Sequence, residues 1–196
     1  MRKLRHEEIP RPDPKTAHSL SGHPVSVLLD NVRSIYNVGA MFRTSDAALI
    51  EKLYLTGITG TPENRGLHKT ALGAQDTVRW EYCRDPLPVV QALKRDGYTI
   101  GVLEITDCPT PTTDIEESSF PLCLIVGNEL HGVREELVAE ADVAFEIPQF
   151  GAKQSLNVAV AYGIAIFDIV RSYRRYAGLG GHPLPSAAGF EGMRHG

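Results

Sequence analysis

The sequence predicts an α/β fold: one domain with a mostly parallel sheet flanked by helices. The chain has 196 residues, of which 42% are hydrophobic and 22% are charged. That length is sufficient for one hydrophobic core and short for two independent ones. Along the chain, short apolar runs alternate with longer helical patterns, as they do in successive β-α units around a parallel sheet.

Six apolar runs are predicted as strands, because each is short and is bounded by polar or turn-forming residues. They cover residues 25–29, 52–55, 78–82, 98–103, 122–126 and 143–147. The run at 122–126 is apolar at every position, which is typical of a strand covered on both faces.

Four helices are predicted between and after these strands, over residues 37–49, 86–95, 133–141 and 156–176. In the second of them Asp85 can cap the helix, Pro86 takes the first helical position and Gly97 follows the end. The last helix gathers three arginines at its C-terminal end, where cations suit the helix dipole. Its apolar side is formed by Val160, Ile164, Phe167 and Val170.

The two ends of the chain differ in composition from the region between them. Residues 1–24 are polar and rich in proline, and we expect a flexible segment there. Residues 178–196 show no periodicity and are expected to be a disordered tail. The folded domain is therefore expected to span residues 25–177.

Composition also limits the class of protein. No apolar run approaches the roughly 18 to 20 residues of a membrane span, and no apolar segment follows the charged N-terminus. Cys83, Cys108 and Cys123 show no CxxC spacing, which indicates neither a disulfide framework nor a zinc site. We expect a cytoplasmic protein with no membrane partner and no metal.

The net charge of −4 argues at first against a nucleic-acid partner, since lysine and arginine supply most of the affinity for phosphate. The charge is, however, unevenly distributed. From Glu104 to Glu146 there are eleven acidic residues and one basic residue, so the remainder carries 19 basic against 13 acidic residues. One face of the protein can therefore be acidic while another contacts phosphate.

Polar residues cluster first in residues 28–47, LLDNVRSIYNVGAMFRTSDA, which we term motif 1. Ligands collect at the carboxyl ends of strands in open α/β sheets, and motif 1 follows the first predicted strand. Asn37 stands near the predicted helix start, where an N-cap is the ordinary role of an asparagine. Arg43 lies within two turns of it, where a lone arginine is ordinarily a surface residue.

Motif 2 covers residues 122–133, LCLIVGNELHGV, in which a buried strand ends in Gly127-Asn128-Glu129. Gly127 and Gly132 would let backbone groups approach a ligand closely, although two glycines also serve a plain turn. Glu129 would in that case be an exposed turn carboxylate, and the neighbouring His131 a surface residue.

Motif 3 covers residues 145–165, FEIPQFGAKQSLNVAVAYGIA, where a strand ending in Ile147-Pro148 leads to a helix start. Ser155 is by default the N-cap of that helix, a role compatible with a second one in a site. Lys153 reads as a surface residue.

Together the three motifs resemble the SPOUT superfamily of RNA methyltransferases, and within it the SpoU/TrmH branch. The order, spacing and strand context of the motifs agree with that family over residues 25–175, nearly all of the expected domain. The residues that carry the resemblance are Asn37, Gly39 and Arg43, then Gly127, Asn128, Glu129 and Gly132, then Ile147, Pro148, Ser155, Leu156, Asn157 and Val158. The chain departs from the family pattern at Gln149 and Ala159.

The resemblance implies the SPOUT fold, in which the C-terminal chain forms a trefoil knot that periodicity alone does not indicate. It also implies transfer of a methyl group from S-adenosylmethionine, with S-adenosylhomocysteine as product, to a ribose 2′-hydroxyl of structured RNA, either tRNA or rRNA. The cofactor would contact Leu103, Glu104, Gly127, Asn128, Glu129, Gly132, Ile147, Pro148, Ser155, Leu156 and Asn157.

The resemblance further implies catalytic roles for Arg43, Asn37, Glu129, Ser155 and Asn157. An arginine is too basic to act as a general base, so Arg43 would stabilise a developing alkoxide or hold the adjacent phosphate. Asn37 would hold Arg43 or the ribose, and Glu129 would orient the arginine or the cofactor. Ser155 and Asn157 would line the transfer site.

The resemblance also implies a homodimer, and the apolar side of the last predicted helix is wider than one small sheet needs. We expect no separate N-terminal RNA-binding domain of the kind that some relatives carry. Recognition of RNA is therefore expected from the catalytic domain, from a partner, or from basic residues: Arg43, Arg65, Lys69, Arg2, Lys3 and Arg5. The stretch 68–74, which contains Lys69, is either a short helix or a polar loop.

Other functions remain open or are excluded by sequence. A nicotinamide-dependent oxidoreductase would need GxGxxG after the first strand, and a P-loop NTPase would need GxxxxGK[ST]; neither occurs. An RNA base methyltransferase of the same superfamily remains an alternative. So does an RNA-binding module that has kept the fold and lost catalysis.

Overall fold

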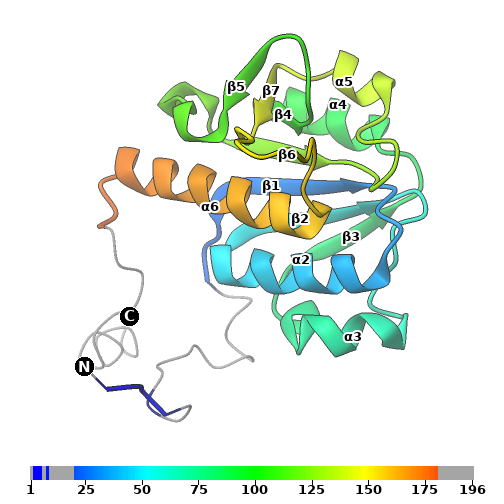
Figure 1. Ribbon diagram of the computed structural model, residues 1–196, viewed down its shortest axis with the longest axis vertical. Helices are drawn as coiled ribbons and strands as arrows, with labels where there is room; N and C mark the ends of the chain where they lie inside the picture. The colour runs from blue at the N-terminus through cyan, green and yellow to red at the C-terminus, as the bar shows by residue number, and fades with distance from the viewer. Residues whose placement is uncertain (1, 6–7, 9–19, 181–196) are drawn as a thin grey trace.

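The computed structural model describes residues 2–5, 8 and 20–180, and it shows one parallel sheet flanked by helices (Figure 1). Seven strands pair in the order β3-β2-β1-β6-β4-β7-β5, and every pair is parallel. The strands are β1 (His23–Asp30), β2 (Ile50–Thr56), β3 (Trp80–Cys83), β4 (Thr99–Leu103), β5 (Pro109–Pro111), β6 (Leu122–Val126) and β7 (Val143–Glu146). The predicted fold class is confirmed.

Helices cover both faces of the sheet, and they are α2 (Ile35–Ala48), α3 (Arg65–Ala71), α4 (Leu87–Arg95), α5 (Glu135–Ala139) and α6 (Val158–Tyr176). Short 3₁₀ turns lie at Ala74–Asp76, Thr112–Asp114 and Glu117–Ser119. Helices α2 and α6 pack side by side on one face, and α4 and α5 cover the other (Figure 1). Helix α3 packs on α2.

Strand β6 shows why the sheet is buried on both sides. Its five residues are all buried, and their side chains alternate between the two layers. Leu122, Leu124 and Val126 belong to the core under α2 and α6, whereas Cys123 and Ile125 belong to the core under α4 and α5. Burial raises the pKa of the Cys123 thiol to about 12, so this cysteine is an inert core residue.

All six predicted strands are present, with bounds that differ by at most two residues and agree fully for β6. The seventh strand, β5, was not predicted because Pro-Thr-Pro has neither an alternating pattern nor two backbone donors. Its position at the edge of the sheet is where a proline-containing strand is tolerated. The expected trefoil knot remains a prediction.

The helix starts differ from those predicted. Helix α2 begins after Ser34, whose side chain accepts a hydrogen bond from the Asn37 backbone N–H at 3.3 Å, so Ser34 and not Asn37 is the N-cap. Helix α6 is capped by Asn157, which accepts bonds from the amides of Ala159 and Val160, and not by Ser155. Each capping residue lies in a polar run in which sequence alone offers several candidates.

Two other predicted helices change in extent. Helix α5 is shorter than the predicted 133–141, and α4 begins at Leu87 with Pro86 as its N-cap, while Asp85 accepts a bond from the Leu87 amide. The sequence left open whether residues 68–74 form a short helix or a polar loop. Residues 68–71 belong to helix α3, so the helix is correct for that part.

The chain termini bear on two further predictions. The first strand begins at His23, inside the segment expected to be flexible. Most of that segment and most of the expected disordered tail, namely residues 1, 6–7, 9–19 and 181–196, lie outside the described residues. Within the described ranges, no helix is both long and apolar enough to cross a membrane.

Candidate functional site

A cavity of about 370 Å³ lies at the carboxyl edge of the sheet, beyond the ends of β4, β6 and β7. Its volume falls within the usual range for small-molecule sites. Ten of the eleven predicted cofactor contacts line it: Leu103, Glu104, Gly127, Asn128, Glu129, Gly132, Ile147, Ser155, Leu156 and Asn157. Pro148, the eleventh, does not.

Nine further lining residues were not predicted as contacts: Ile105, Val126, Leu130, Phe145, Glu146, Gln149, Gln154, Val158 and Ala161. Most are apolar or stand beside a predicted residue, so their residue type gave no signal. The cavity has carboxylates at Glu104, Glu129 and Glu146, while no lysine, arginine or histidine is among its described lining residues.

Glu129 links motif 2 to the start of α2. Its carboxylate accepts hydrogen bonds from the backbone N–H groups of Arg33 and Ser34 at 2.8 and 2.9 Å, and from the side-chain amide of Asn37 at 2.9 Å. Burial alone would raise the pKa of Glu129, but these three bonds outweigh it and lower the pKa below its ordinary value. Glu129 is therefore a fixed carboxylate and not an exposed turn residue.

Asn37 joins all three motifs at one point. Its Nδ2 donates to Glu129, and its Oδ1 accepts a 3.3 Å hydrogen bond from Nδ2 of Asn157. The predicted catalytic residues Asn37, Glu129 and Asn157 are thus brought together. Ser155 lines the same cavity and makes no hydrogen bond with another described residue.

Arg43 is not brought to this cluster. Its side chain is exposed on α2. Arg43 lies six residues beyond Asn37, so the two side chains point in directions about 120° apart around the helix axis. It makes no hydrogen bond or ion pair with another described residue, and it does not line the cavity. Neither Asn37 nor Glu129 contacts the Arg43 side chain, so the other roles that the resemblance implied for them, toward the ribose and the cofactor, stay predictions.

The loop of motif 2 is built on close backbone approaches. A side chain on Gly127 would meet the backbone of Gly132 at 2.1 Å, and one on Gly132 would meet the Glu104 carboxylate at 2.1 Å. Glu104 itself accepts a 2.9 Å hydrogen bond from the Val133 amide. Both glycines are therefore required by the loop's own packing, and both also line the cavity, so an approach to a ligand stays a prediction.

Gly39 of motif 1 also serves packing. A side chain there would lie 2.0 Å from the Thr70 hydroxyl and 2.7 Å from the Leu67 carbonyl oxygen. The residue lets α3 pack closely on α2 and does not face the cavity.

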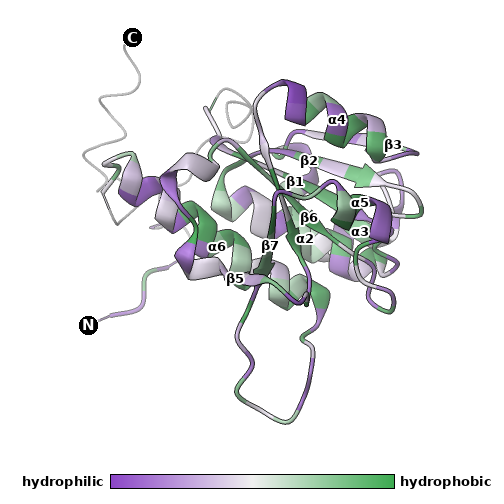
Figure 2. Ribbon diagram, turned by 90° about the horizontal axis from the view of Figure 1, so that it is seen from above, coloured by the Kyte–Doolittle hydropathy of each residue, from purple (hydrophilic) through white to green (hydrophobic). Residues whose placement is uncertain are grey.

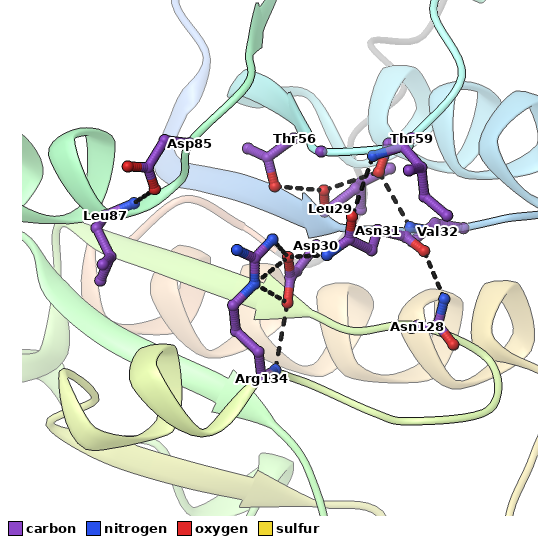
Figure 3. A network of polar contacts seen from close by, with 12 residues as sticks. Leu29, Asp30, Asn31, Val32, Thr56, Thr59, Asp85, Leu87, Asn128 and Arg134 are labelled. Carbon is purple, nitrogen blue, oxygen red and sulfur yellow. Dashed lines mark hydrogen bonds and ion pairs between the residues drawn. The ribbon is translucent and has the colours of Figure 1, made fainter.

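A partly buried ion pair ties the end of β1 to the start of α5, directly after motif 2 (Figure 3). Asp30 is 1% exposed. Its carboxylate accepts hydrogen bonds from Nε, Nη2 and the backbone N–H of Arg134. These hydrogen bonds raise the pKa of Arg134. Beside the pair, the Asn128 side chain donates to the Asn31 carbonyl oxygen at 2.7 Å. Sequence reasoning missed the pair of Asp30 and Arg134, which lie 104 positions apart.

The predicted RNA-binding cations lie in two places. Arg65 and Lys69 are exposed on α3, one turn apart. Lys3 is exposed near the N-terminus, where Arg2 forms a 2.8 Å ion pair with Glu8 and Arg5 lies 3.6 Å from the same carboxylate.

The segment between β7 and α6 extends away from the rest of the molecule (Figure 2). Its residues from Pro148 to Asn157 include Lys153 and are largely exposed; the ring of Phe150 is 98% exposed. The segment forms one wall of the cavity through Gln149, Gln154 and Ser155. That wall therefore lacks support on its outer side.

Comparison with known proteins begins with a match of residues 24–167 to the SpoU rRNA Methylase family. A tRNA (guanosine(18)-2'-O)-methyltransferase from Thermus thermophilus is 32% identical over 162 residues, which cover 81% of this chain and 80% of that protein. A 23S rRNA (guanosine-2'-O-)-methyltransferase RlmB from Vibrio parahaemolyticus is also 32% identical, over 76% of this chain and 59% of that protein.

Two solved structures share the fold. The TrmH/SpoU tRNA modifying enzyme of A. aeolicus superposes with a TM-score of 0.74 at 27% identity, over 92% of this chain and 89% of that one. An AdoMet-bound rRNA methyltransferase from Sinorhizobium meliloti superposes with a TM-score of 0.69 at 27% identity, over 82% of this chain and 60% of that one.

Proposed function

Because the chain belongs to the SpoU rRNA methylase family, we propose that it transfers the methyl group of S-adenosylmethionine to a ribose 2′-hydroxyl of tRNA or rRNA. Relatives that act on each kind of RNA are about equally similar to it, and they modify guanosine in both cases. Guanosine is therefore the first nucleoside to examine, and a cytoplasmic location would suit either RNA.

The charge of the cavity carries this proposal. Three glutamates line the cavity, and its described lining residues include no cation. Such a site favours a positively charged sulfonium and repels the pyrophosphate of a dinucleotide. Apolar side chains, among them Leu103, Ile147 and Leu156, supply surfaces for an adenine ring. S-Adenosylmethionine fits this combination and would supply an activated methyl group.

The residues around the cavity have separable tasks. Glu129 holds Asn37, and Asn37 in turn meets Asn157, so the start of α2 and the start of α6 are fixed relative to each other. In-line transfer requires that kind of alignment between the hydroxyl and the methyl carbon. Ser155 and Asn157 border the cavity where the two reactants would meet.

Arg43 would stabilise the oxygen that attacks the methyl group, as a preorganised donor that stays protonated. It is exposed and has no partner among the described residues, which suits a residue whose partner is RNA. Arg43 lies on a side of α2 that does not face the cavity of its own chain. We therefore infer that it acts at the cavity of a second copy of the chain.

We propose a homodimer that pairs through α2 and α6. Helix α6 leaves an apolar stripe in solvent, formed by Val160 (51% exposed), Ile164 (40% exposed) and the space above Gly163. The neighbouring helix α2 exposes Tyr36 (56% exposed) and Arg43 on its outer side. A two-fold dimer would cover this stripe and bring each Arg43 to the other subunit.

Sedimentation tests the dimer directly. The wild-type protein should sediment at twice 21.5 kDa at micromolar concentration, and Ile164→Asp should give the 21.5 kDa monomer. A wild-type monomer would reject the dimer and any role of Arg43 across it.

Calorimetry tests the cofactor proposal before any RNA is identified. The cavity is lined by residues of this chain, mostly from the loops of motifs 2 and 3, so S-adenosylmethionine should bind without RNA and S-adenosylhomocysteine should compete. Both should raise the melting temperature. Absence of binding and of a thermal shift at millimolar concentration of either compound would overturn the proposal.

RNA binding would use the exposed cations Arg65 and Lys69, together with Arg43 and the N-terminal Arg2, Lys3 and Arg5. Arg2 and Arg5 share Glu8, whose carboxylate competes with phosphate for their guanidinium groups. The cations of α3 have no such competitor among the described residues and are the stronger candidates.

A further inference from the structure

A second hollow lies beyond the carboxyl end of β2 and beside β3. Its volume is about 580 Å³, and its walls are the loop 57–64 and two aromatic residues of β3, Trp80 and Tyr82. Because all strands are parallel, the carboxyl ends of β2 and β3 lie at the same edge of the sheet as those of β4, β6 and β7 (Figure 1). The two sites are separated by three to four strand spacings, or roughly 15 Å.

The aromatic rings are fixed and yet remain accessible. The Trp80 ring meets Phe42 edge-on, with 6.5 Å between centroids, and is half-buried. Tyr82 is 45% exposed, and its hydroxyl donates a 2.9 Å hydrogen bond to the Gly57 carbonyl oxygen. Ile58 beside it is 65% exposed. Rigid rings with an open face are the surfaces on which unpaired nucleobases stack.

The loop wall is attached to motif 1. The Ile58 amide donates to the Asn31 side chain at 3.0 Å, and the Thr59 hydroxyl donates to the Leu29 carbonyl oxygen and accepts from the Val32 amide (Figure 3). Gly57 has a φ of +62°, and a side chain there would lie 2.0 Å from Asn31 Oδ1. A group bound in this hollow is therefore held in fixed register with α2, which carries Asn37 and Arg43.

The charges around the hollow distinguish a base from a phosphate. The Glu63 carboxylate lines it and would repel phosphate, but it can accept a hydrogen bond from the amino group of a base. Arg65 directly follows Asn64, which also lines the hollow, and Lys69 lies one turn further on the same side of α3. The base would sit in the hollow while its flanking phosphates meet α3.

We propose that this hollow binds an unpaired nucleobase of the RNA substrate, stacked on Trp80 and Tyr82. Its separation from the cofactor cavity means that the base belongs to a nucleotide other than the one that is methylated. The inference rests on the proposed function, because it is that function which makes RNA the occupant.

The single tryptophan of the chain gives a direct probe, since Trp80 alone supplies indole fluorescence. Titration with a short single-stranded RNA of mixed sequence should quench this emission, because stacking places a base against the ring. Inorganic polyphosphate, which carries the charge without bases, should leave it unchanged. Unchanged emission in the presence of an RNA that the protein binds and methylates would overturn the inference.

Substitution of Tyr82 separates stacking from structure. Tyr82→Ala should raise the KM for RNA about ten-fold, the usual scale for a lost stacking partner, with kcat at saturating RNA and the affinity for S-adenosylmethionine unchanged. Tyr82→Phe keeps the ring and should stay near wild type. If Tyr82→Ala lowers the melting temperature markedly, the exposed Ile58→Glu serves instead and should raise the KM similarly.

Tyr176→Ala is the matched control, because Tyr176 is also exposed and its hydroxyl also donates to a backbone oxygen, that of Ile115. It should leave the KM unchanged. Wild-type KM values for Tyr82→Ala and Ile58→Glu, or dissociation of the dimer by Tyr82→Ala, would overturn the inference while leaving the proposed function in place. A wild-type protein that methylates no RNA would overturn the proposed function itself, and this inference with it.

Discussion

The side-chain amide of Asn37 donates a 2.9 Å hydrogen bond to the carboxylate of Glu129, 92 residues further along the chain. The same carboxylate accepts hydrogen bonds from the backbone N–H groups of Arg33 and Ser34, which directly precede α2. One glutamate of the motif 2 loop thus sets the position of α2, and through Asn37 it reaches Asn157 at the start of α6.

Glu129→Gln should weaken both fold and catalysis. A glutamine keeps one acceptor oxygen and places an amide donor against groups that themselves donate, so at least one hydrogen bond is lost at a partly buried site. The free energy of unfolding should fall by about 1 to 3 kcal/mol, and single-turnover methylation should fall at least about ten-fold. Glu117→Gln, an exposed carboxylate without such contacts, is the control and should behave as wild type. Equal rates in both variants would show that Glu129 aligns nothing.

The pH dependence of this contribution has a definite sign. The pKa of Glu129 is lower in the folded protein than its ordinary value, so its stabilising contribution is fully present above the unfolded-state pKa of roughly 4.3. It is lost as the pH falls through the lowered folded-state pKa. The difference in melting temperature between wild type and Glu129→Gln should be constant from about pH 6 to about pH 9 and should shrink in acid. A difference that changes near neutral pH would contradict this assignment.

Removal of Arg134 should destabilise the protein through Asp30. Arg134→Ala would leave a carboxylate that is 1% exposed without its charged partner. Because the arginine itself is about a third exposed, we expect a loss of about 2 to 3 kcal/mol, below the range for a fully buried pair. Denaturant unfolding measures the loss.

The double variant Asp30→Asn with Arg134→Met removes both charges and should recover part of that stability. If it is no more stable than Arg134→Ala, the cost of the single variant does not come from the unpaired carboxylate.

Arg43→Ala should abolish methyl transfer while cofactor binding persists. The loss of one preorganised donor at a developing oxyanion typically costs about 10² to 10³ in rate, and Arg43→Lys should recover little because it lacks the planar guanidinium. Single-turnover assays with saturating RNA and calorimetry with S-adenosylmethionine measure the two effects. An ordinary surface arginine would change neither.

Mixing inactive variants tests whether Arg43 acts across the dimer. Arg43→Ala and Asn157→Ala should each be inactive, but a heterodimer would contain one intact site, made of the arginine of one subunit and the cavity of the other. After subunit exchange the mixture should regain about a quarter of wild-type activity. If the mixture stays inactive, Arg43 acts on the cavity of its own subunit and not across the dimer.

The parts of the fold that sequence predicted are those determined locally or by burial. The apolar run at Leu122–Val126 predicted a strand covered on both faces, and the resemblance to the SpoU/TrmH family predicted ten of the residues around the cavity. The choice of Ser34 over Asn37 as N-cap was not predictable, because it depends on Glu129 fixing the preceding amides from a distant loop. The aromatic hollow was missed for a similar reason, since Trp80 and Tyr82 alone predict only a strand.

The identity of the methylated group tests the central claim most directly. Purified protein should be incubated with labelled S-adenosylmethionine and total RNA, and the labelled RNA digested to nucleosides and examined by mass spectrometry. Our account predicts that the added methyl group fragments with the ribose, on a tRNA or rRNA nucleoside, and that Arg43→Ala yields none. A methyl group that fragments with the base, or RNA that acquires no label from a protein that binds the cofactor, would contradict it.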